Sequence, residues 1–380
     1  MTTSAALRAT LVEQLTADGT LTDPAWRRAA EAVPRELFLS EYFQEVPGSN
    51  PTGYRAVHAD SPGWLEAIYT NQTLITQLSG NTRPGDARGR TVTGAPSSSS
   101  TLPSLVLGMW QQLEVRSGQR VLEIGTGTGY STCLGAHRLG DQNIVSVEVD
   151  PGVAERAEAA IKAAGYAPAL VVGDGLDGHA EGGPYDRLIA TCAIRYLPHP
   201  WLYQVKPGGK ILATLSGWSY GFALVLLTVT GPGRASGRFL PGYTSFMMAR
   251  PHTPPPRQSI TLAPGDQRPS RIDPAVLGTW TGSWVAQLGA PSAERMGAGG
   301  QQILLDVATG SQARSEPDGN GGWTITQRGP LRLWDQVESA VVQWQERGCP
   351  HQEAFGLTVT EHGQRVWLGG EDGPGWDLPV

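Results

Sequence analysis

Three glycines spaced two residues apart are the first feature of this sequence with chemical meaning. They stand at 125, 127 and 129 within Val121–Tyr130 (V-L-E-I-G-T-G-T-G-Y), between an apolar run and a helical pattern. Glycine lets the backbone turn sharply and lets a ligand lie against it without meeting a side chain. A dinucleotide phosphate loop, G-x-G-x-x-G, needs glycine at 130, where this sequence has tyrosine. The spacing therefore favours a ligand without a pyrophosphate.

Two acidic residues close the next two apolar runs. Glu148 ends the run V-S-V-E, and Asp174 ends V-V-G-D. A carboxylate at the first place can accept hydrogen bonds from both hydroxyls of a ribose, and one at the second can meet an adenine amino group. Ligands of parallel sheets bind outside the carboxyl ends of the strands. The glycine loop and the two acids together therefore predict a nucleoside site.

Alternating strand and helix patterns must position these residues. Strands are predicted at 120–124, 143–149, 169–172, 187–191 and 210–215, and helices at 3–17, 23–34, 102–113, 131–139, 151–164 and 200–205. The alternation indicates an α/β fold, a Rossmann-like doubly wound sheet with helices on both faces. Two further strands, at 223–229 and 245–249, are expected to be antiparallel.

The remaining segments have a different texture. Residues 1–100 are expected to hold the N-terminal helices and a lid-like loop, since 40–100 looks irregular and rich in Pro and Gly. Residues 251–271 are Pro-rich and predict a linker between a domain at 1–250 and a smaller α+β domain at 272–380. The latter holds 7 of the 12 Trp.

Two patterns stand out in this C-terminal segment. Residues 331–347 predict an amphipathic helix, and its Trp334 and Trp344 stripe is typical of a core-facing side. The alternating runs 355–360 and 364–368, joined by Glu-His-Gly, predict a β-hairpin.

Composition limits the classes of function. The net charge of −6 argues against a nucleic-acid partner and against an anionic membrane surface. The N-terminus lacks a signal-peptide pattern, and three Cys far apart in the sequence predict neither a disulfide framework nor a zinc site, so a cytoplasmic protein is expected. The seven His lack metal-binding spacing, and no metal is expected.

The ordered set of motifs resembles the class I S-adenosylmethionine-dependent methyltransferases. Glu123 with the three glycines is similar to their first motif, Glu148 to the second and Gly173-Asp174 to the third, and Pro207-Gly208-Gly209 is similar to their later turn. A Rossmann-like sheet that binds another nucleotide is the alternative. The resemblance implies S-adenosylmethionine as cofactor and a binding site made of Glu123, Gly125, Thr126, Gly127, Gly129, Glu148, Val149, Gly173, Asp174, Gly175 and Thr191.

Three further stretches resemble the protein L-isoaspartate O-methyltransferases over roughly residues 1–250. The helix at 23–34 runs into V-P-R-E-L-F, G-D-G-L-D-G is followed by P-Y-D, and Thr101-Leu-Pro103 is similar to the family's S-x-P signature. The resemblance places the family's active-site Ser on Thr101. The usual Q-T-I-S approach to that residue is missing, and four serines precede it instead.

A carboxylate acceptor suits this inventory of side chains. It is already ionised at neutral pH, so it attacks a sulfonium methyl without a general base and needs only to be aimed and dehydrated. Hydroxyls at a helix start can do this, and Thr101, Ser100 and Ser99 are the predicted catalytic donors. A flexible, solvated loop is the alternative for the serine run.

The added C-terminal segment, with F-G-L-T-V-T and W-D-L-P near its end, resembles a sub-branch of this family that tailors ribosomally made lanthipeptides, lasso peptides and graspetides. The resemblance implies a modified, macrocyclic peptide as partner, methylated on one Asp and then converted to an aspartimide or isoaspartate. Residues 272–380, with their seven Trp, are predicted to recognise this peptide and to take no part in methyl transfer. General repair of isoaspartate is the alternative within the family. A peptide-binding scaffold without catalysis is disfavoured by the intact glycine loop and both acids.

Overall fold

The predicted parallel strands lie in one sheet of the computed structural model, which describes residues 3–256, 262–298 and 300–380. They are β6 (Val121–Ile124), β7 (Ile144–Glu148), β8 (Ala169–Val172) and the first part of β9 (Tyr185–Ile194), in the order β9-β6-β7-β8. Every residue of β6 and β7 is buried, as expected for parallel strands covered on both faces. The covering helices that follow them are α5 (Tyr130–Leu139) and α6 (Pro151–Ala163), which confirms the α/β prediction.

The chain divides into two compact units. Unit 1 comprises Met1–Thr191 and Tyr203–Leu212, and unit 2 comprises Cys192–Leu202 and Ala213–Val380. The boundary therefore runs through β9 and β10 (Val205–Leu215), which α7 (His199–Gln204) connects, rather than at the expected residue 250. The ten-stranded sheet to which both strands belong has the order β20-β19-β18-β12-β11-β10-β9-β6-β7-β8.

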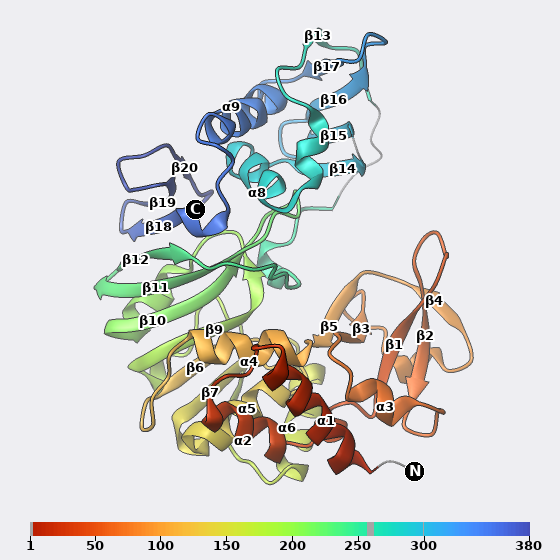
Figure 1. Cartoon of the computed structure of the whole chain (residues 1–380), viewed down its shortest axis with the longest axis vertical. Coiled ribbons are helices and arrows are strands. Elements are labelled where there is room, and N and C mark those ends of the chain that lie inside the picture. Colours follow the sequence, from red (N-terminus) through yellow and green to blue (C-terminus); the bar gives the residue numbers. More distant parts are fainter. Residues whose placement is uncertain (1–2, 257–261, 299) are drawn as a thin grey trace. The chain divides into compact units, whose positions relative to one another are not determined.

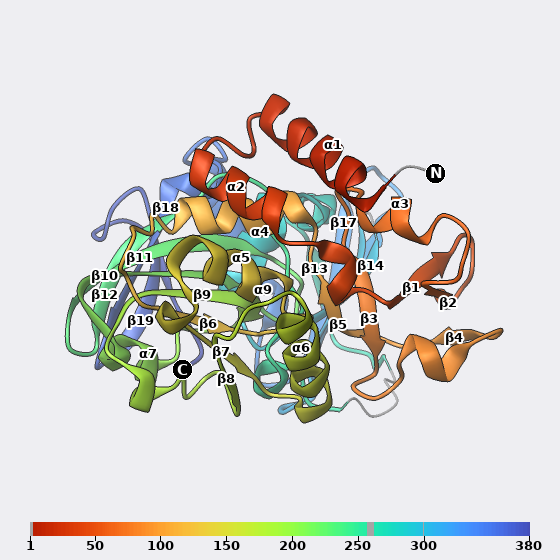
Figure 2. The same ribbon diagram turned by 90° about the horizontal axis from the view of Figure 1, so that it is seen from below.

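The N-terminal helices of unit 1 form as predicted. They are α1 (Ser4–Ala17), α2 (Pro24–Ala32) and α4 (Pro103–Gln112). The Asp23 side chain caps α2 by accepting from Ala25 N–H at 2.7 Å, and proline occupies the first helical position. The stacked rings of Trp26 and Trp110, 5.1 Å apart and both buried, join α2 to α4. The helix α2 packs against α1 on one side and against α4 and α5 on the other (Figure 2).

The expected lid-like loop is instead a small antiparallel sheet of unit 1, drawn in orange in Figure 1. Its strands are β1 (Glu41–Val46), β2 (Gly53–His58), β3 (Leu74–Leu78), β4 (Thr91–Thr93) and β5 (Pro96–Ser100), in the order β4-β2-β1-β3-β5, with α3 (Trp64–Ile68) between β2 and β3. The prediction of irregular structure was wrong because short strands separated by Pro and Gly lack a long periodic signal. Four buried side chains, Phe43, Tyr54, Leu78 and Ala87, form the core of this sheet.

Unit 2 holds the antiparallel part of the ten-stranded sheet. Its strands are β11 (Ala223–Gly231), β12 (Arg234–Phe239), β18 (Phe355–Thr360), β19 (Gly363–Leu368) and β20 (Gly375–Asp377). The segment 245–249, expected to be an antiparallel strand, forms only an isolated bridge, in which Met248 pairs in parallel with Ala193 of β9. The antiparallel partner of β11 is instead β12, which follows the turn at Pro232 and Gly233, where Gly233 has φ of +66°. The predicted hairpin is confirmed as β18 and β19, and β18 pairs with β12, so the C-terminal strands extend this sheet.

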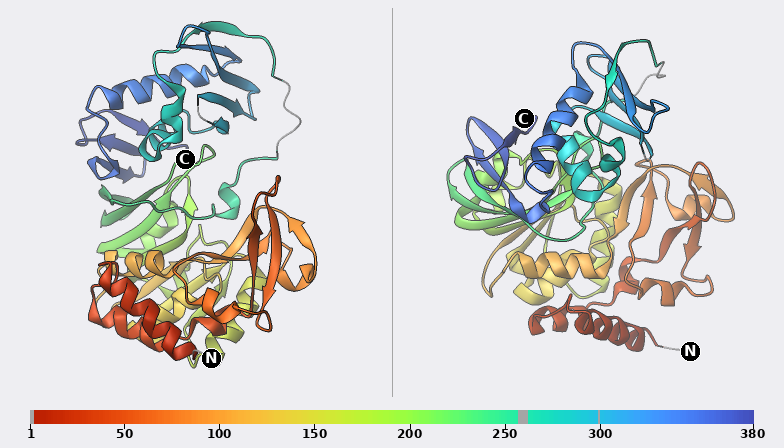
Figure 3. Two further views of the ribbon diagram at one scale, coloured as in Figure 1. Left: turned by 45° about the vertical axis from the view of Figure 1, so that its right-hand side comes forward. Right: turned by 45° about the horizontal axis from the view of Figure 1, so that its top comes forward.

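A second antiparallel sheet and two helices complete unit 2 (Figure 3). Its strands are β13 (Asp266–Pro269), β14 (Glu294–Ala298), β15 (Gln301–Asp306), β16 (Ser311–Pro317) and β17 (Trp323–Arg328), and the helices are α8 (Trp280–Gly289) and α9 (Leu333–Gln345). The expected linker at 251–271 is partly a strand, since β13 pairs with β17; its residues 257–261 lie outside the described part. The Trp334 and Trp344 stripe of α9 is buried, as predicted.

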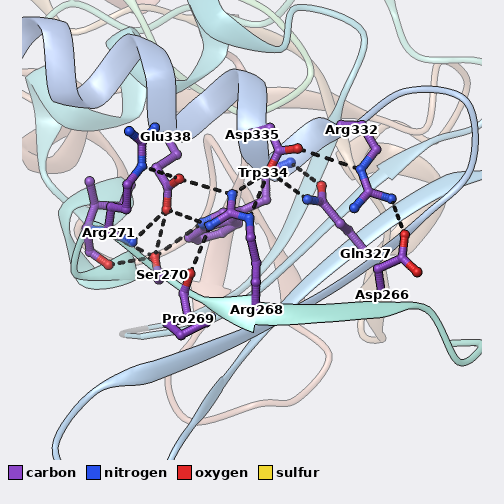
Figure 4. A network of polar contacts seen from close by, with 11 residues as sticks. Asp266, Arg268, Pro269, Ser270, Arg271, Gln327, Arg332, Trp334, Asp335 and Glu338 are labelled. Carbon is purple, nitrogen blue, oxygen red and sulfur yellow. Dashed lines mark hydrogen bonds and ion pairs between the residues drawn. The ribbon is translucent and has the colours of Figure 1, made fainter.

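A network of ion pairs ties β13 to α9 (Figure 4). The buried Glu338 lies 3.0 Å from Arg268 and 2.8 Å from Arg271, and it accepts from the Arg271 N–H at 2.7 Å. Asp335 pairs with Arg268 and with Arg332. Because burying an unpaired carboxylate is costly, this network fixes the strand on the helix. Within the described part of the chain, no helix is long and apolar enough to cross a membrane.

Candidate active site

The glycine loop connects β6 to α5 in unit 1, at the carboxyl end of the parallel strands. Gly125 and Gly127 have φ of +94° and +55°, a region that favours glycine. A Cβ at Gly125 would lie 2.9 Å from Thr191 Oγ1, and one at Gly127 would lie 3.5 Å from the Ser99 carbonyl oxygen. The loop is held from behind, where Gly125 N–H donates to the Val147 carbonyl at 2.8 Å. Its backbone is thus shaped to receive a ligand closely.

The ribose acid predicted from the sequence lies directly against this loop. Glu148 Oε2 accepts from the Gly127 N–H at 2.9 Å, and its Oε1 accepts from the Asp150 N–H at 3.1 Å. These two bonds orient the carboxylate toward the glycine loop, where the sequence predicts a ribose. The side chain is nearly buried, and such bonds are stronger where water is excluded.

Glu123 has a different place from the other predicted cofactor residues. It is fully buried in β6, and its oxygens accept from Ser131 Oγ at 2.5 Å, Thr132 Oγ1 at 2.6 Å and Ser146 Oγ at 2.8 Å. Burial raises the pKa of Glu123 above its usual value, although the three hydroxyls oppose the shift. These bonds join β6 to α5 and β7 beneath the loop, so Glu123 braces the loop from the protein interior.

The remaining cofactor candidates surround the loop. Asp174 Oδ1 accepts from the Leu176 N–H at 2.9 Å, and the Gly173 N–H donates to the Glu148 carbonyl at 3.0 Å. Thr191 Oγ1 donates to the Gly125 carbonyl at 2.6 Å. Gly175 packs so closely on β6 that a Cβ would lie 2.4 Å from Ile124 Cγ2. These residues thus hold the ends of β6, β8 and β9 in register.

Two more of the predicted residues complete the set. Thr126 is buried, with its Oγ1 2.7 Å from Ser146 Oγ, and Gly129 has φ of +89° at the start of α5. Val149, next to Glu148, has 38% of its surface exposed, so an apolar side chain stands open beside the ribose acid. Such a side chain can contact the flat face of an adenine ring.

The serine run is a strand, β5, rather than a flexible loop. Ser97 Oγ donates to Gln77 Oε1 at 2.9 Å, and Ser98 Oγ lies 3.2 Å from Thr76 Oγ1, so β3 engages both hydroxyls. The Ser99 carbonyl oxygen faces Gly127 of the glycine loop, and Thr101 lies just before α4. The structure therefore brings two of the predicted donors, Ser99 and Thr101, to the cofactor loop or the helix start. The third, Ser100, is buried, and its Oγ accepts from Arg35 at 3.5 Å.

A residue that the sequence reasoning did not single out organises this segment. Arg35, in the V-P-R stretch, is fully buried and donates to the carbonyls of Ser100 at 3.4 Å and Thr101 at 3.2 Å. It also donates to the carbonyls of Ile68, Thr70 and Gln72 at 2.6, 3.2 and 3.1 Å. Burial lowers the pKa of Arg35 to about 10, so it stays charged at neutral pH. Its motif was visible in the sequence, but its carbonyl partners were not.

A second link joins the small sheet to the cofactor site. Gln77 Nε2 donates to Asp150 Oδ2 at 3.1 Å, and Asp150 caps α6 two residues after Glu148. The predicted donors Ser99, Ser100 and Thr101 form the acceptor segment, which is thus held by β3 and by Arg35. Among the described residues, no three His, Cys, Asp or Glu side chains are grouped to hold a metal ion.

Comparison with known proteins agrees with this geometry. A family model described as protein-L-isoaspartate(D-aspartate) O-methyltransferase matches residues 91–222. The chain is 30% identical over 201 residues to the protein-L-isoaspartate O-methyltransferase of Ignicoccus hospitalis, covering 52% of this chain and 77% of that one. It is 39% identical over 112 residues to enzyme 2 of that name from Archaeoglobus fulgidus, but this match spans only 51% of the relative.

A solved structure titled protein-L-isoaspartate O-methyltransferase has a similar fold. The likeness covers 95% of this chain and 99% of that one, with a TM-score of 0.55 and 19% identity. It therefore includes both units. With these matches, the chain belongs to the protein-L-isoaspartate O-methyltransferase family of S-adenosylmethionine-dependent carboxyl methyltransferases.

Proposed function

We propose that the chain methylates the side-chain carboxylate of one aspartate in a ribosomally made, macrocyclic peptide. The observation that carries the proposal is the placement of the acceptor segment: Ser99 lies beside Gly127, and Arg35 clamps Thr101. The segment thus lies beside the cofactor loop through the Ser99 backbone, and the buried Arg35 cation contacts the carbonyls of Ser100 and Thr101. Such surroundings suit a carboxylate acceptor, which needs orientation and dehydration but no base.

S-adenosylmethionine, when bound, supplies an electrophilic methyl group. Gly125, Gly127, Glu148 and Asp174 are the residues proposed to hold it, because they line the carboxyl ends of β6, β7 and β8. The residues of this chain then have three tasks: to orient the acceptor carboxylate, to exclude water, and to favour its negative charge. Arg35 contributes to the last task through its buried positive charge.

The product of methylation then reacts within the peptide. The ester has a better leaving group than the carboxylate, so the backbone nitrogen of the following residue attacks the ester carbonyl. A new C–N bond forms, the C–OCH3 bond breaks, and the amide proton leaves with the methoxy group as methanol. The resulting aspartimide persists or takes up water to give isoaspartate.

General repair of isoaspartyl residues is the second candidate function. It is favoured by the names of the relatives and by the solved structure whose fold covers 95% of this chain. Because that likeness includes the C-terminal unit, the added domain does not by itself argue against repair. The departures at Thr101 and in the preceding serines are the features that favour a specialised acceptor.

One experiment separates the two functions. The purified protein is incubated with S-adenosylmethionine and either a macrocyclic peptide encoded beside its gene or a linear isoaspartyl peptide. Mass spectrometry then reports a gain of one methylene for an ester or a loss of one water for an aspartimide. Modification of the macrocycle at one normal aspartate supports the proposal, whereas methylation of the isoaspartyl peptide alone supports repair.

A further inference from the structure

A cavity on the small sheet of unit 1 lies outside the residues assigned to the cofactor and acceptor. It has a volume of about 420 Å³ and is lined by residues of β2, of the turn after it and of the segment leading into β4. Arg55, Arg88 and Arg90 line it together with one acid, Asp60, so its formal charge is +2. This is a local excess of positive charge in a chain whose net charge is −6.

The arginines differ in how far they are already engaged. Arg88 donates to both carboxylate oxygens of Asp60, at 3.1 and 3.3 Å. Arg90 donates to the Asp86 carbonyl but pairs with no carboxylate in the described part of the chain. The Arg55 side chain makes no hydrogen bond or ion pair with any described residue. Two guanidinium groups on the cavity wall are therefore available to an anion.

The alternation of β2 explains why these groups face away from the core. Tyr54 is buried in the core of the small sheet, so the next residue, Arg55, projects from the opposite face. Arg55 is paired across the strands with Thr91, next to Arg90. A guanidinium group binds a carboxylate through two parallel hydrogen bonds in one plane. The volume of about 420 Å³ is large enough for several side chains of a ligand, rather than for one small ion.

We propose that this cavity binds acidic side chains of the peptide substrate at a distance from the methylated residue. The inference rests on the proposed function, since it takes a peptide as the occupant. The strand order is β4-β2-β1-β3-β5, so the cavity on β2 and β4 and the acceptor segment after β5 stand at opposite edges of one sheet. Three to four strand spacings of ~4.8 Å give roughly 14–19 Å between them.

That separation sets the position of the acidic residues in the substrate. An extended peptide rises ~3.3–3.6 Å per residue, so the acidic side chains belong about four to six residues from the methylated aspartate. In a macrocycle, the same distance determines which part of the ring reaches the cavity when the aspartate lies at the acceptor segment. The cavity thus selects substrates by charge at one end, while Thr101 and Arg35 position the acceptor at the other.

The test measures binding without methyl transfer. Fluorescence anisotropy follows a labelled hexaglutamate peptide, which has no aspartate, titrated with the full-length protein in the absence of S-adenosylmethionine. The double variant Arg55→Gln/Arg90→Gln is compared with Arg27→Gln/Arg28→Gln, which removes the same charge from the exposed face of α2. We expect about tenfold weaker binding for the first variant only, and no binding of hexaglutamine.

Other outcomes overturn the proposal. Equal affinities of the two double variants for hexaglutamate would remove the cavity from peptide recognition. Binding of tripolyphosphate without binding of hexaglutamate would make the cavity a phosphate site. Thermal unfolding of each variant checks that the fold is retained, and because these arginines are exposed we expect no change. If hexaglutamate binds as expected but no macrocycle is methylated, the proposed function is wrong, whereas the cavity is still a binding site for acidic peptides.

Discussion

The Gly127 N–H donates to Glu148 Oε2 at 2.9 Å, joining the glycine loop of β6 to the acid at the end of β7. The bond holds the carboxylate facing the loop, and the Asp150 N–H holds its other oxygen. The acid is therefore oriented before any ligand arrives, which lowers the entropy lost on binding.

Replacing this acid should weaken cofactor binding. In Glu148→Ala the acceptor for the ribose hydroxyls is lost, and hydrogen bonds to a charged group are worth ~1.5–3 kcal/mol, so affinity for S-adenosylmethionine should fall roughly 10–150-fold. Titration calorimetry measures it. Glu155→Ala, which removes an exposed acid of α6, is the matched control and should bind normally. Unchanged affinity in a folded Glu148→Ala protein would contradict the assignment of the ribose acid.

Thr101 should affect turnover without affecting the cofactor. If its hydroxyl donates to the acceptor carboxylate, Thr101→Ala lowers kcat by about tenfold and leaves the affinity for S-adenosylmethionine unchanged, whereas Thr101→Ser keeps most activity. Steady-state kinetics and calorimetry measure the two quantities. Ser104→Ala, one turn along the chain, serves as control. Full activity in Thr101→Ala would move the role to Ser99, whose carbonyl lies beside Gly127.

Arg35 should act as a positioning residue. Arg35→Met leaves five backbone carbonyls without their donor, including those of Ser100 and Thr101, and should destabilise unit 1 by roughly 3 kcal/mol. Arg35→Lys keeps the charge and some donors, so it should recover part of kcat. The test compares, for Arg35→Lys, the fold loss of kcat from steady-state kinetics with the fold loss of S-adenosylmethionine affinity from calorimetry. A purely structural role predicts equal loss of both, and a positioning role predicts loss of kcat alone in Arg35→Lys.

The sequence predicted where the cofactor candidates lie in the fold better than the surroundings of the acceptor candidates. Gly125, Glu148 and Asp174 follow strands with strong apolar runs, so their joint position could be read from strand order. The partners of Arg35 lie up to 66 residues away in the sequence, and nothing local indicates them. The same reason hid the small sheet, whose pairs, such as that between Phe43 and Ile75, join short strands across irregular segments.

In unit 2, the sequence predicted only those elements whose residues are close together in the chain. The α9 stripe and the hairpin of β18 and β19 follow from helical and alternating periodicity. The pairing of β18 with β12 does not, since it joins residues more than a hundred positions apart. Four of the seven C-terminal Trp, at 284, 334, 344 and 367, are core residues, so the count of Trp in this segment says little about a binding surface.

The ion-pair network of unit 2 should make its stability depend on pH. Burial alone would raise the pKa of Glu338, but hydrogen bonds from Arg268 and Arg271 outweigh it and hold the pKa below the usual 4.5. A carboxyl with a depressed pKa in the folded state contributes stability above its unfolded pKa and loses that contribution as pH falls through the folded pKa. Stability should therefore decline below pH 4.5.

Glu338→Gln isolates this contribution. At neutral pH the variant should be less stable by roughly 1–3 kcal/mol, and its stability should change less between neutral pH and pH 4. Urea titrations followed by Trp fluorescence measure the free energy of unfolding at each pH. Trp334 reports on the network because its Nε1 donates to Ser270 Oγ. Glu346→Gln, at the exposed end of α9, is the control. Identical pH profiles for the two variants would show that the network is not the source.

A truncation near residue 250 is not the right test of peptide recognition by unit 2. It would remove β18, the partner of β12, and uncover Phe239, which is buried 5.2 Å from Trp284. Surface substitutions are therefore preferable. Tyr243 is 79% exposed, and its ring lies 5.2 Å from that of Trp280.

The last prediction is that these aromatic residues bind the macrocyclic peptide. Trp280 also stacks on Phe222, with the ring centroids 6.2 Å apart, so Phe222, Trp280 and Tyr243 form one aromatic cluster. Aromatic anchors dominate recognition, so Tyr243→Ala should raise the KM for the macrocycle about tenfold, with kcat unchanged. Tyr203→Ala, at an exposed tyrosine of α7, is the control. A rigid ring loses less entropy on binding than a flexible chain. The linear precursor should therefore have a higher KM than the macrocyclic peptide in the unaltered enzyme. A Tyr243→Ala protein with the same KM as the control would remove the aromatic residues from substrate recognition.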